Sequence, residues 1–169
     1  DHLMSIKFVY NEELWNVVSV YAPQTGCAAQ ELEIFWKDFN DLMKKIPKDE
    51  LLLIAGDLNG HVRETNFSFE DCHGGKGYGL RNEAGEEILQ TCKSWELIFL
   101  NTMFVKKQEH LITYHSGGRA TQIDYHCCSK FMRNCERDCK IIPGETVAKQ
   151  HRLLLTEFFI DHQEGFQTS

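Results

Sequence analysis

The sequence lacks any apolar run that approaches the roughly 20 residues needed to cross a lipid bilayer, and it lacks the basic and then apolar N-terminal pattern of a secretory signal. These absences exclude a membrane-spanning helix and predict a protein without a membrane partner. The chain has 169 residues, of which 42% are hydrophobic, so it is long enough to form a domain with its own core. Nothing suggests a second domain, and we expect 1–169 to be a single domain.

The sequence also lacks the cysteine pattern of a disulfide framework or a zinc site. Its seven cysteines are odd in number, and the chain is larger than the small secreted proteins that disulfides stabilise, so we expect reduced thiols in an intracellular compartment. Cys127, Cys128, Cys135 and Cys139 lie close together but contain no CxxC pair. Because neighbouring residues of a strand face opposite ways, Cys127 and Cys128 cannot easily bind one ion. We therefore predict no structural zinc.

Positive charge is scarce and unevenly distributed. The net charge of −7 argues against attraction of nucleic acid by the whole surface, because phosphate binding depends on clustered Lys and Arg. Residues 1–100 have 9 basic and 17 acidic groups, whereas residues 101–152 have 9 basic and 5 acidic groups. The second segment is compatible with a polyanion site or with a solvated basic face. Eight of the nine basic residues make up the possible positive region: Lys106, Lys107, Arg119, Lys130, Arg133, Arg137, Lys140 and Arg152.

Two helices are predicted from apolar residues that recur every three or four positions. The members of the first stripe are Leu32, Phe35, Trp36, Phe39, Leu42, Met43 and Ile46. The second helix begins after Asn82, which can cap it, and continues to Trp95. The GGKGYG stretch before Asn82 lacks the GxxxxGK[ST] pattern of a phosphate-binding loop, so we expect a flexible surface or substrate loop.

The remaining apolar runs predict strands. They are IKFVY, LWNVVSVYAP, LLLIAGD, LIFLNTMF, LITYHS, TQIDYHCCS and HRLLLTEFFI. A short basic helix or turn and Pro143-Gly144 separate the last two. Strands outnumber helices, and LLLIAGD has the continuous apolar character of a central strand covered on both faces. The pattern favours an α/β protein with layered sheets and flanking helices over a Rossmann-like sheet.

Asp57 is the last residue of the LLLIAGD run, and Asn59 follows it with one residue between them. Side chains two positions apart in an extended chain can point to the same side. A carboxylate can orient or deprotonate water, and an amide can donate to charge that develops on a phosphoryl oxygen, so the pair suits phosphodiester hydrolysis. Asp-x-Asn-Gly is also a common turn, which leaves a purely structural role open.

Asp124 and His151 are the other candidates for chemistry. Asp124 lies inside the strand-like run TQIDYHCCS, where a carboxylate is costly unless it is paired or faces a site. His151 begins the final run, HRLLLTEFFI. A buried acid that orients an imidazole suits work on a phosphate. Ordinary surface positions for both residues remain an alternative.

The order of several motifs adds to these hypotheses. They are VYAPQ, GDLNGHV, GYGLRNEAGEEIL, LNTMF, TYHSGGRATQIDY, DCKIIPGE and QHRLL. In this order they resemble the endonuclease/exonuclease/phosphatase superfamily, and within it the RTE-type LINE retrotransposon endonucleases and the related craniofacial development protein 2-like, or bucentaur-like, group. The resemblance covers nearly the whole chain. It implies a four-layered α/β sandwich, in which two packed, largely antiparallel sheets are flanked by helices.

The resemblance also implies an apurinic-like endonuclease that nicks DNA and depends on Mg²⁺ or Mn²⁺. Asp57 would orient or activate the attacking water, and Asn59 would stabilise the transition state. Asp124 would orient His151, which would act at the scissile phosphate. A divalent cation would neutralise phosphate charge and assist the leaving oxygen.

Tyr21 and Asn101 would bind the substrate phosphate by the same resemblance, and two departures limit it. The family's amino-terminal strands, with a catalytic Asn and a metal-binding Glu, lie upstream of VYAPQ and have no counterpart here. We therefore expect a C-terminal portion of the domain with reduced metal occupancy. Gln150 stands at the usual position of an Asp, and an amide cannot replace the charge of a carboxylate.

Three functions follow as alternatives. The first is a DNA-nicking endonuclease of retrotransposon origin, impaired by truncation, which we would expect in the nucleus. The second is a catalytically inactive, domesticated remnant that binds nucleic acid or protein. The third is a phosphatase that acts on an inositol lipid or nucleotide, which the QIDY and QHRLL context disfavours.

Overall fold

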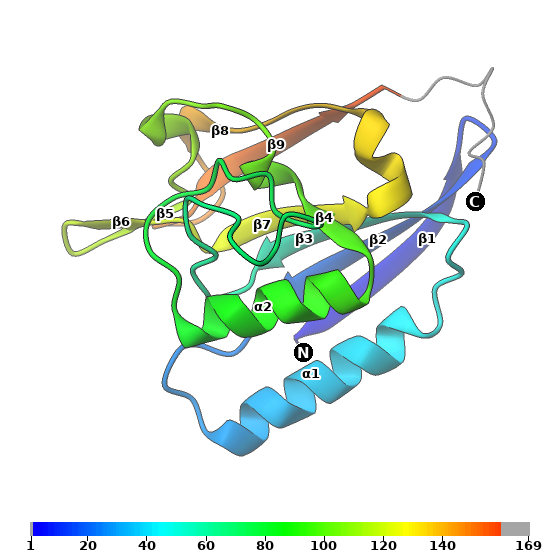
Figure 1. Ribbon diagram of the computed structural model, residues 1–169, viewed down its shortest axis with the longest axis horizontal. Helices are drawn as coiled ribbons and strands as arrows, with labels where there is room; N and C mark the ends of the chain where they lie inside the picture. The colour runs from blue at the N-terminus through cyan, green and yellow to red at the C-terminus, as the bar shows by residue number, and fades with distance from the viewer. Residues whose placement is uncertain (1, 160–169) are drawn as a thin grey trace.

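The computed structural model describes residues 2–159 and has a five-stranded sheet at its centre (Figure 1). The strand order is β1-β2-β3-β7-β4. Strands β2 and β3 are parallel, and the other neighbours in this sheet are antiparallel. The strands are β1 (Leu3–Tyr10), β2 (Glu13–Tyr21), β3 (Leu51–Asp57), β4 (Leu97–Phe99) and β7 (Asp124–Ser129).

Both α-helices cover one face of this sheet, as Figure 1 shows. Helix α1 (Ala29–Met43) buries Phe35, Phe39 and Met43, members of the predicted apolar stripe. Helix α2 (Glu83–Ser94) begins at Asn82, whose side chain accepts a hydrogen bond from the Gly85 amide at 2.8 Å. The predicted helices and the predicted cap are therefore confirmed, although Ile46 lies beyond α1.

The other face of the central sheet packs against a second sheet, formed by β8 (Glu136–Thr146) and β9 (Arg152–Phe158). A third, short sheet pairs β5 (Tyr114–Ser116) with β6 (Arg119–Thr121). The predicted α/β class with packed, largely antiparallel sheets is confirmed. Within residues 2–159 the layers are the helices, the central sheet and the β8–β9 sheet.

The two faces of the central sheet have separate apolar cores, and β7 contributes to both. Cys127 packs on the helix side, with Phe35 and Leu89, whereas Cys128 packs on the β8–β9 side, with Trp15. The adjacent thiols therefore face opposite ways, as the strand pattern predicts. No helix among the described residues is long and apolar enough to span a membrane.

Several strand predictions were wrong in extent. LIFLNTMF ends as a strand at Phe99, because the 3-10 helix η1 (Leu100–Thr102) follows directly. LITYHS contributes only its last three residues, after the 3-10 helix η2 (Gln108–His110). TQIDYHCCS is divided between β6 and β7. The predicted short basic helix or turn is η3 (Lys130–Asn134).

The long strand β8 was missed altogether. Its sequence, ERDCKIIPGET, begins with charged residues and contains Pro143 and a Gly144 with φ of +87°. Those residues normally indicate a turn. The strand tolerates them because its pairing with β9 is irregular between Ile141 and Thr146, where a proline need not donate a ladder hydrogen bond.

The GGKGYG stretch, predicted to be a flexible surface or substrate loop, belongs to the segment between β3 and α2, which is organised around a buried histidine. His73 has no exposed surface, and its Nδ1 accepts from the Gly75 amide at 3.0 Å. Its Nε2 therefore carries the proton and donates to the Arg63 carbonyl at 3.1 Å. Burial lowers the pKa of His73 to about 4, so this histidine is neutral at physiological pH.

Candidate functional site

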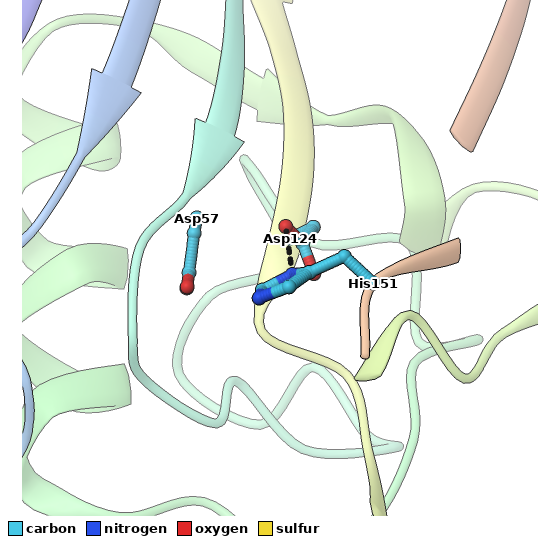
Figure 2. Close-up of side chains that lie close together, drawn as sticks. All are labelled: Asp57, Asp124 and His151. Carbon is cyan, nitrogen blue, oxygen red and sulfur yellow. Dashed lines mark hydrogen bonds and ion pairs between the residues drawn. The ribbon is translucent and has the colours of Figure 1, made fainter. Parts of the chain in front are cut away.

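Three neighbouring strands bring Tyr21, Asp57 and Asp124 to the same end of the central sheet. Tyr21 of β2 pairs in register with Asp57 of β3, and Asp57 pairs in register with Asp124 of β7. Polar side chains thus gather where a buried apolar strand ends, as the LLLIAGD sequence predicts. Figure 2 shows Asp57 and Asp124 at the ends of their strands, with His151 from the segment that leads into β9.

Asp57 is buried, with 9% of its surface exposed, and its carboxylate contacts the backbone of the turn that follows β3. Oδ1 accepts a hydrogen bond from the Asn59 backbone amide at 2.8 Å. Burial is the main reason why the pKa of Asp57 is raised to about 6, and the nearby Asp124 carboxylate raises it further against the lowering effects of Asn59 and His151. A carboxylate with a pKa near neutrality is well suited to accept a proton from water.

Asp124 and His151 form a hydrogen-bonded pair across 27 residues of sequence. His151 Nδ1 lies 3.0 and 3.1 Å from the two carboxylate oxygens of Asp124. A proton on Nδ1 donates to the carboxylate, which leaves Nε2 free to act on another group. The Tyr114 ring packs edge-on against the imidazole, with centroids 4.8 Å apart. The sequence hypothesis that Asp124 meets and orients His151 matches this geometry.

Asp57, Asp124 and His151 could together hold a metal ion. One ligand atom from each lies within 4.8 Å of the others, and among residues 2–159 this is the one such group of acidic, histidine or cysteine side chains. Carboxylate oxygens are the ligands that Mg²⁺ and Mn²⁺ prefer. The high pKa of Asp57 also fits, because a nearby cation would stabilise the ionised form that burial disfavours.

Asn59 lies in the turn after β3, and Tyr21 is the exposed last residue of β2. Asn59 has a positive φ of 50°, a conformation that asparagine tolerates. Its side-chain amide donates to the Ala22 carbonyl at 2.8 Å and keeps a second N–H for a ligand. Tyr21 is 47% exposed, and its hydroxyl accepts from Gln24 at 3.4 Å. Both side chains can therefore reach a substrate.

Asn101 is packed against the backbone of β7. It is buried, and its amide group is bonded to the β7 backbone on both sides: Oδ1 accepts from the His126 amide at 2.8 Å, and Nδ2 donates to the Asp124 carbonyl at 3.1 Å. This geometry favours positioning of Asp124 over direct contact with phosphate.

Thr113 is a residue that sequence reasoning missed. It has no exposed surface, and its hydroxyl accepts from the backbone amides of Ile123 and Asp124, each at 3.0 Å. Its carbonyl accepts from the Arg152 amide at 2.8 Å. Thr113 thus connects β7, which begins with Asp124, to the start of β9, next to His151. The only available signal was its place at the start of the TYHSGGRATQIDY motif.

Most of the candidate residues line an open cleft of about 830 Å³, whereas Asp124 and Asn101 are not among its lining residues. Tyr21, Asp57, Asn59, Gln150 and His151 line it. Arg119 is the one arginine or lysine among the residues that line the cleft. The sequence did not indicate the other lining residues, which are Gln24, Thr25, His61, Tyr114, Ser116, Gly117, Thr121 and Ile123.

The basic residues of 101–152 do not form one surface around this cleft. Lys106 and Lys140 both pair with Asp138 on β8, and Lys130 lies 3.8 Å from Asp71. Their charge is therefore partly neutralised away from the candidate site. Arg119 alone of the basic set lines the cleft.

The fold is that of the endonuclease/exonuclease/phosphatase proteins. The endonuclease domain of TRAS1, a telomere-specific non-LTR retrotransposon, matches 94% of the chain with a TM-score of 0.66 and 13% identity, and the chain covers 64% of it. An AP endonuclease from Archaeoglobus fulgidus matches 92% with a TM-score of 0.64 and 12% identity, and 65% of it is covered. An endonuclease/exonuclease/phosphatase family protein from Leptotrichia buccalis matches 92%, with a TM-score of 0.58, 18% identity and 54% coverage.

In sequence, the chain is similar to craniofacial development protein 2. It is 31% identical to the Bos taurus protein over 160 residues and 30% identical to the Tragulus javanicus protein over the same length, in each case 94% of this chain. The chain spans 27% and 28% of the length of these relatives. No protein-family model matches the chain. The predicted resemblance to this group and to retrotransposon endonucleases is confirmed.

Proposed function

We propose that the chain is the catalytic part of a metal-dependent phosphodiesterase that nicks DNA, as an apurinic-like endonuclease of retrotransposon origin. The observation that supports this most is the cluster of Asp57, Asp124 and His151, of which Asp57 and His151 line an open cleft. The likeness of the fold to a retrotransposon endonuclease domain and to an AP endonuclease is the second support. DNA as the substrate makes the nucleus the proposed location.

The residues of the cleft divide the reaction between them. Asp57, ionised above pH about 6, orients the attacking water and takes its proton. Asn59 donates its free N–H to charge that develops on a phosphoryl oxygen. His151, held through Nδ1 by Asp124, presents Nε2 to the scissile phosphate. Tyr21, at the rim, contacts a phosphate oxygen.

Asp57 and Asp124 would hold a divalent cation, Mg²⁺ or Mn²⁺, beside His151. When bound, this ion would neutralise phosphate charge and stabilise the leaving oxygen. With two carboxylates in the cluster, affinity would depend partly on the phosphate oxygens of the substrate.

A plasmid assay tests the proposal. Supercoiled DNA is incubated with Mg²⁺ and either the chain or a longer protein that includes more of the length of its relatives. We expect conversion to the open-circular form, with loss of roughly 100-fold or more in Asp124→Asn and His151→Ala. Glu145→Gln, which changes an exposed carboxylate outside the cleft, serves as the control. Absence of nicking by both lengths, or equal nicking by His151→Ala, would refute the enzyme hypothesis.

A binding module without catalysis, for protein or nucleic acid, is the second candidate, because the charge of the protein disfavours capture of a polyanionic substrate for hydrolysis. The net charge is −7, and Arg119 is the one permanent cation that lines the cleft. Salt-dependent DNA binding without cleavage would identify this function. Hydrolysis of small phosphoesters without plasmid nicking would instead indicate a phosphatase.

A further inference from the structure

The β5–β6 hairpin forms one wall of the cleft and projects from the body of the protein (Figure 1). Each of its strands has three residues, and a two-residue turn, Gly117 and Gly118, connects them. Both glycines have positive φ, of 54° and 75°, as a tight hairpin turn requires. Because such a short hairpin has little core of its own, its orientation depends on contacts at its base.

Gln150 makes three hydrogen bonds along β5 that hold the hairpin to the rest of the protein. Its carbonyl accepts from the His115 amide at 2.9 Å. Its side-chain Oε1 accepts from the Tyr114 hydroxyl at 3.2 Å, and its Nε2 donates to the Ser116 hydroxyl at 2.7 Å. Gln150 is thus bonded to every residue of β5, although it is itself exposed.

The contact with Ser116 extends to a charged residue across the hairpin. Ser116 pairs in register with Arg119, the one arginine or lysine that lines the cleft. Arg119 has no ion pair or side-chain hydrogen bond among residues 2–159. The place of the Arg119 backbone at the cleft is therefore set by the hairpin, which Gln150 holds.

We propose that Gln150 is a positioning residue that latches the β5–β6 hairpin and thereby places Arg119 against a phosphate of a polymeric nucleic-acid substrate. An amide suits this role because it accepts from one hydroxyl and donates to the other. It also adds no negative charge beside His151, at the entrance that a phosphate must use. The effect on substrate rests on the proposed nuclease function, whereas the latch itself does not.

Amide hydrogen exchange tests the latch without any need for activity. The His115 amide is the reporter, because its acceptor is the Gln150 carbonyl. Gln150→Met keeps the length of the side chain and removes both side-chain bonds, so exchange at His115 should accelerate about tenfold, as expected when hydrogen bonds of ordinary strength are lost. Lys149→Met, the same replacement at an exposed neighbour, should leave it unchanged.

Two further variants separate a latch from a general loss of stability. Gln150→Glu can accept from both hydroxyls, so it should keep the slow exchange of the wild type. Ser116→Ala should accelerate exchange by itself and add little to Gln150→Met, because both changes break the same bond. Exchange at His115 that is equally slow in Gln150→Met and in the wild type would overturn the latch.

Steady-state nicking tests the consequence for the substrate. Gln150→Met should raise KM for DNA about tenfold while kcat changes much less, and Arg119→Gln should raise KM similarly without adding to the first change. A fall in kcat at constant KM, or fully additive effects, would overturn the positioning of Arg119. If the wild type nicks no DNA, the proposed function fails, and the exchange experiment still decides the latch.

Discussion

Asp57→Asn should make the protein more stable at neutral pH while removing its chemistry. Asp57 is 9% exposed, and its pKa is raised from 3.8 to about 6, so the folded state binds a proton that the unfolded state releases. This difference costs about 3 kcal/mol of unfolding free energy once both states are ionised. Asparagine at this position is never charged and keeps an oxygen that can accept from the Asn59 amide.

The sign of the effect follows from the direction of the pKa change. Because the folded pKa is raised, the penalty is absent below pH about 4, grows as the pH rises from about 4 to 6, and is complete above that range. The variant should therefore gain about 3 kcal/mol at pH 8 but only about 1 kcal/mol at pH 4.5. At about 2–4 °C per kcal/mol, the gain at pH 8 corresponds to about 6–12 °C in Tm.

Thermal and urea unfolding at the two pH values measure this gain. Asp49→Asn, at an exposed acid in the loop before β3, controls for the loss of one negative charge. Saturating Mn²⁺ should raise the Tm of the wild type and leave Asp57→Asn nearly unchanged, because the ion stabilises the same carboxylate. A variant that is less stable than the wild type at pH 8, or a gain that does not shrink toward pH 4.5, would refute the reasoning.

Three other predictions concern buried or capping residues that hold the surrounding fold in place. Thr113→Val should lower the free energy of unfolding by about 2 kcal/mol and remove most of the nicking activity, because two backbone amides lose their acceptor. Chemical unfolding and the plasmid assay measure these two losses. Thr113→Ser keeps the hydroxyl and should preserve both stability and activity. Asn82→Ala should cost about 1–2 kcal/mol in urea unfolding, since its side chain caps α2 and also accepts from the His61 amide, whereas Asn82→Asp should cost less. The pKa of His73 is lowered from 6.5 to about 4, so its contribution to stability is complete above pH 6.5 and falls by about 3 kcal/mol toward pH 4. Unfolding midpoints measured across this pH range should show the loss of stability. In His73→Gln the same midpoints should depend less on pH.

The elements that could be predicted from sequence are those in which one local signal dominates. The LLLIAGD run is a strand covered on both faces, and the Asn82 cap is a contact within a single turn. The strand β8 could not be predicted, because Pro143 and Gly144 are tolerated only through an irregular pairing with β9, which is a tertiary feature. Local propensity is a weak guide where a distant strand supplies the partner.

The candidate site shows the same division. Asp57 and Asn59 were identifiable because Asp57 ends a buried strand and Asn59 lies just beyond it. The contact between Asp124 and His151 depends on how β7 and the start of β9 meet, across 27 residues of sequence, so residue chemistry and motif order could suggest it but no local pattern could predict it. Thr113 was missed because its role is to accept from backbone amides that lie 10 and 11 positions away. No periodicity within a single element encodes such a contact.

The charges of the cleft also explain why its chemistry should require a cation. When Asp57 is ionised, the cluster has two carboxylates and one imidazole, and Arg119 is the single arginine or lysine among the residues that line the cleft. A phosphodiester brings one more negative charge toward a protein whose net charge is −7. Repulsion of this kind is strongest where burial excludes water, as it does at Asp57. A divalent cation between the carboxylates and the phosphate would reverse the local sign of the interaction, so DNA affinity should rise with Mn²⁺ in the wild type and lose that dependence in Asp57→Asn.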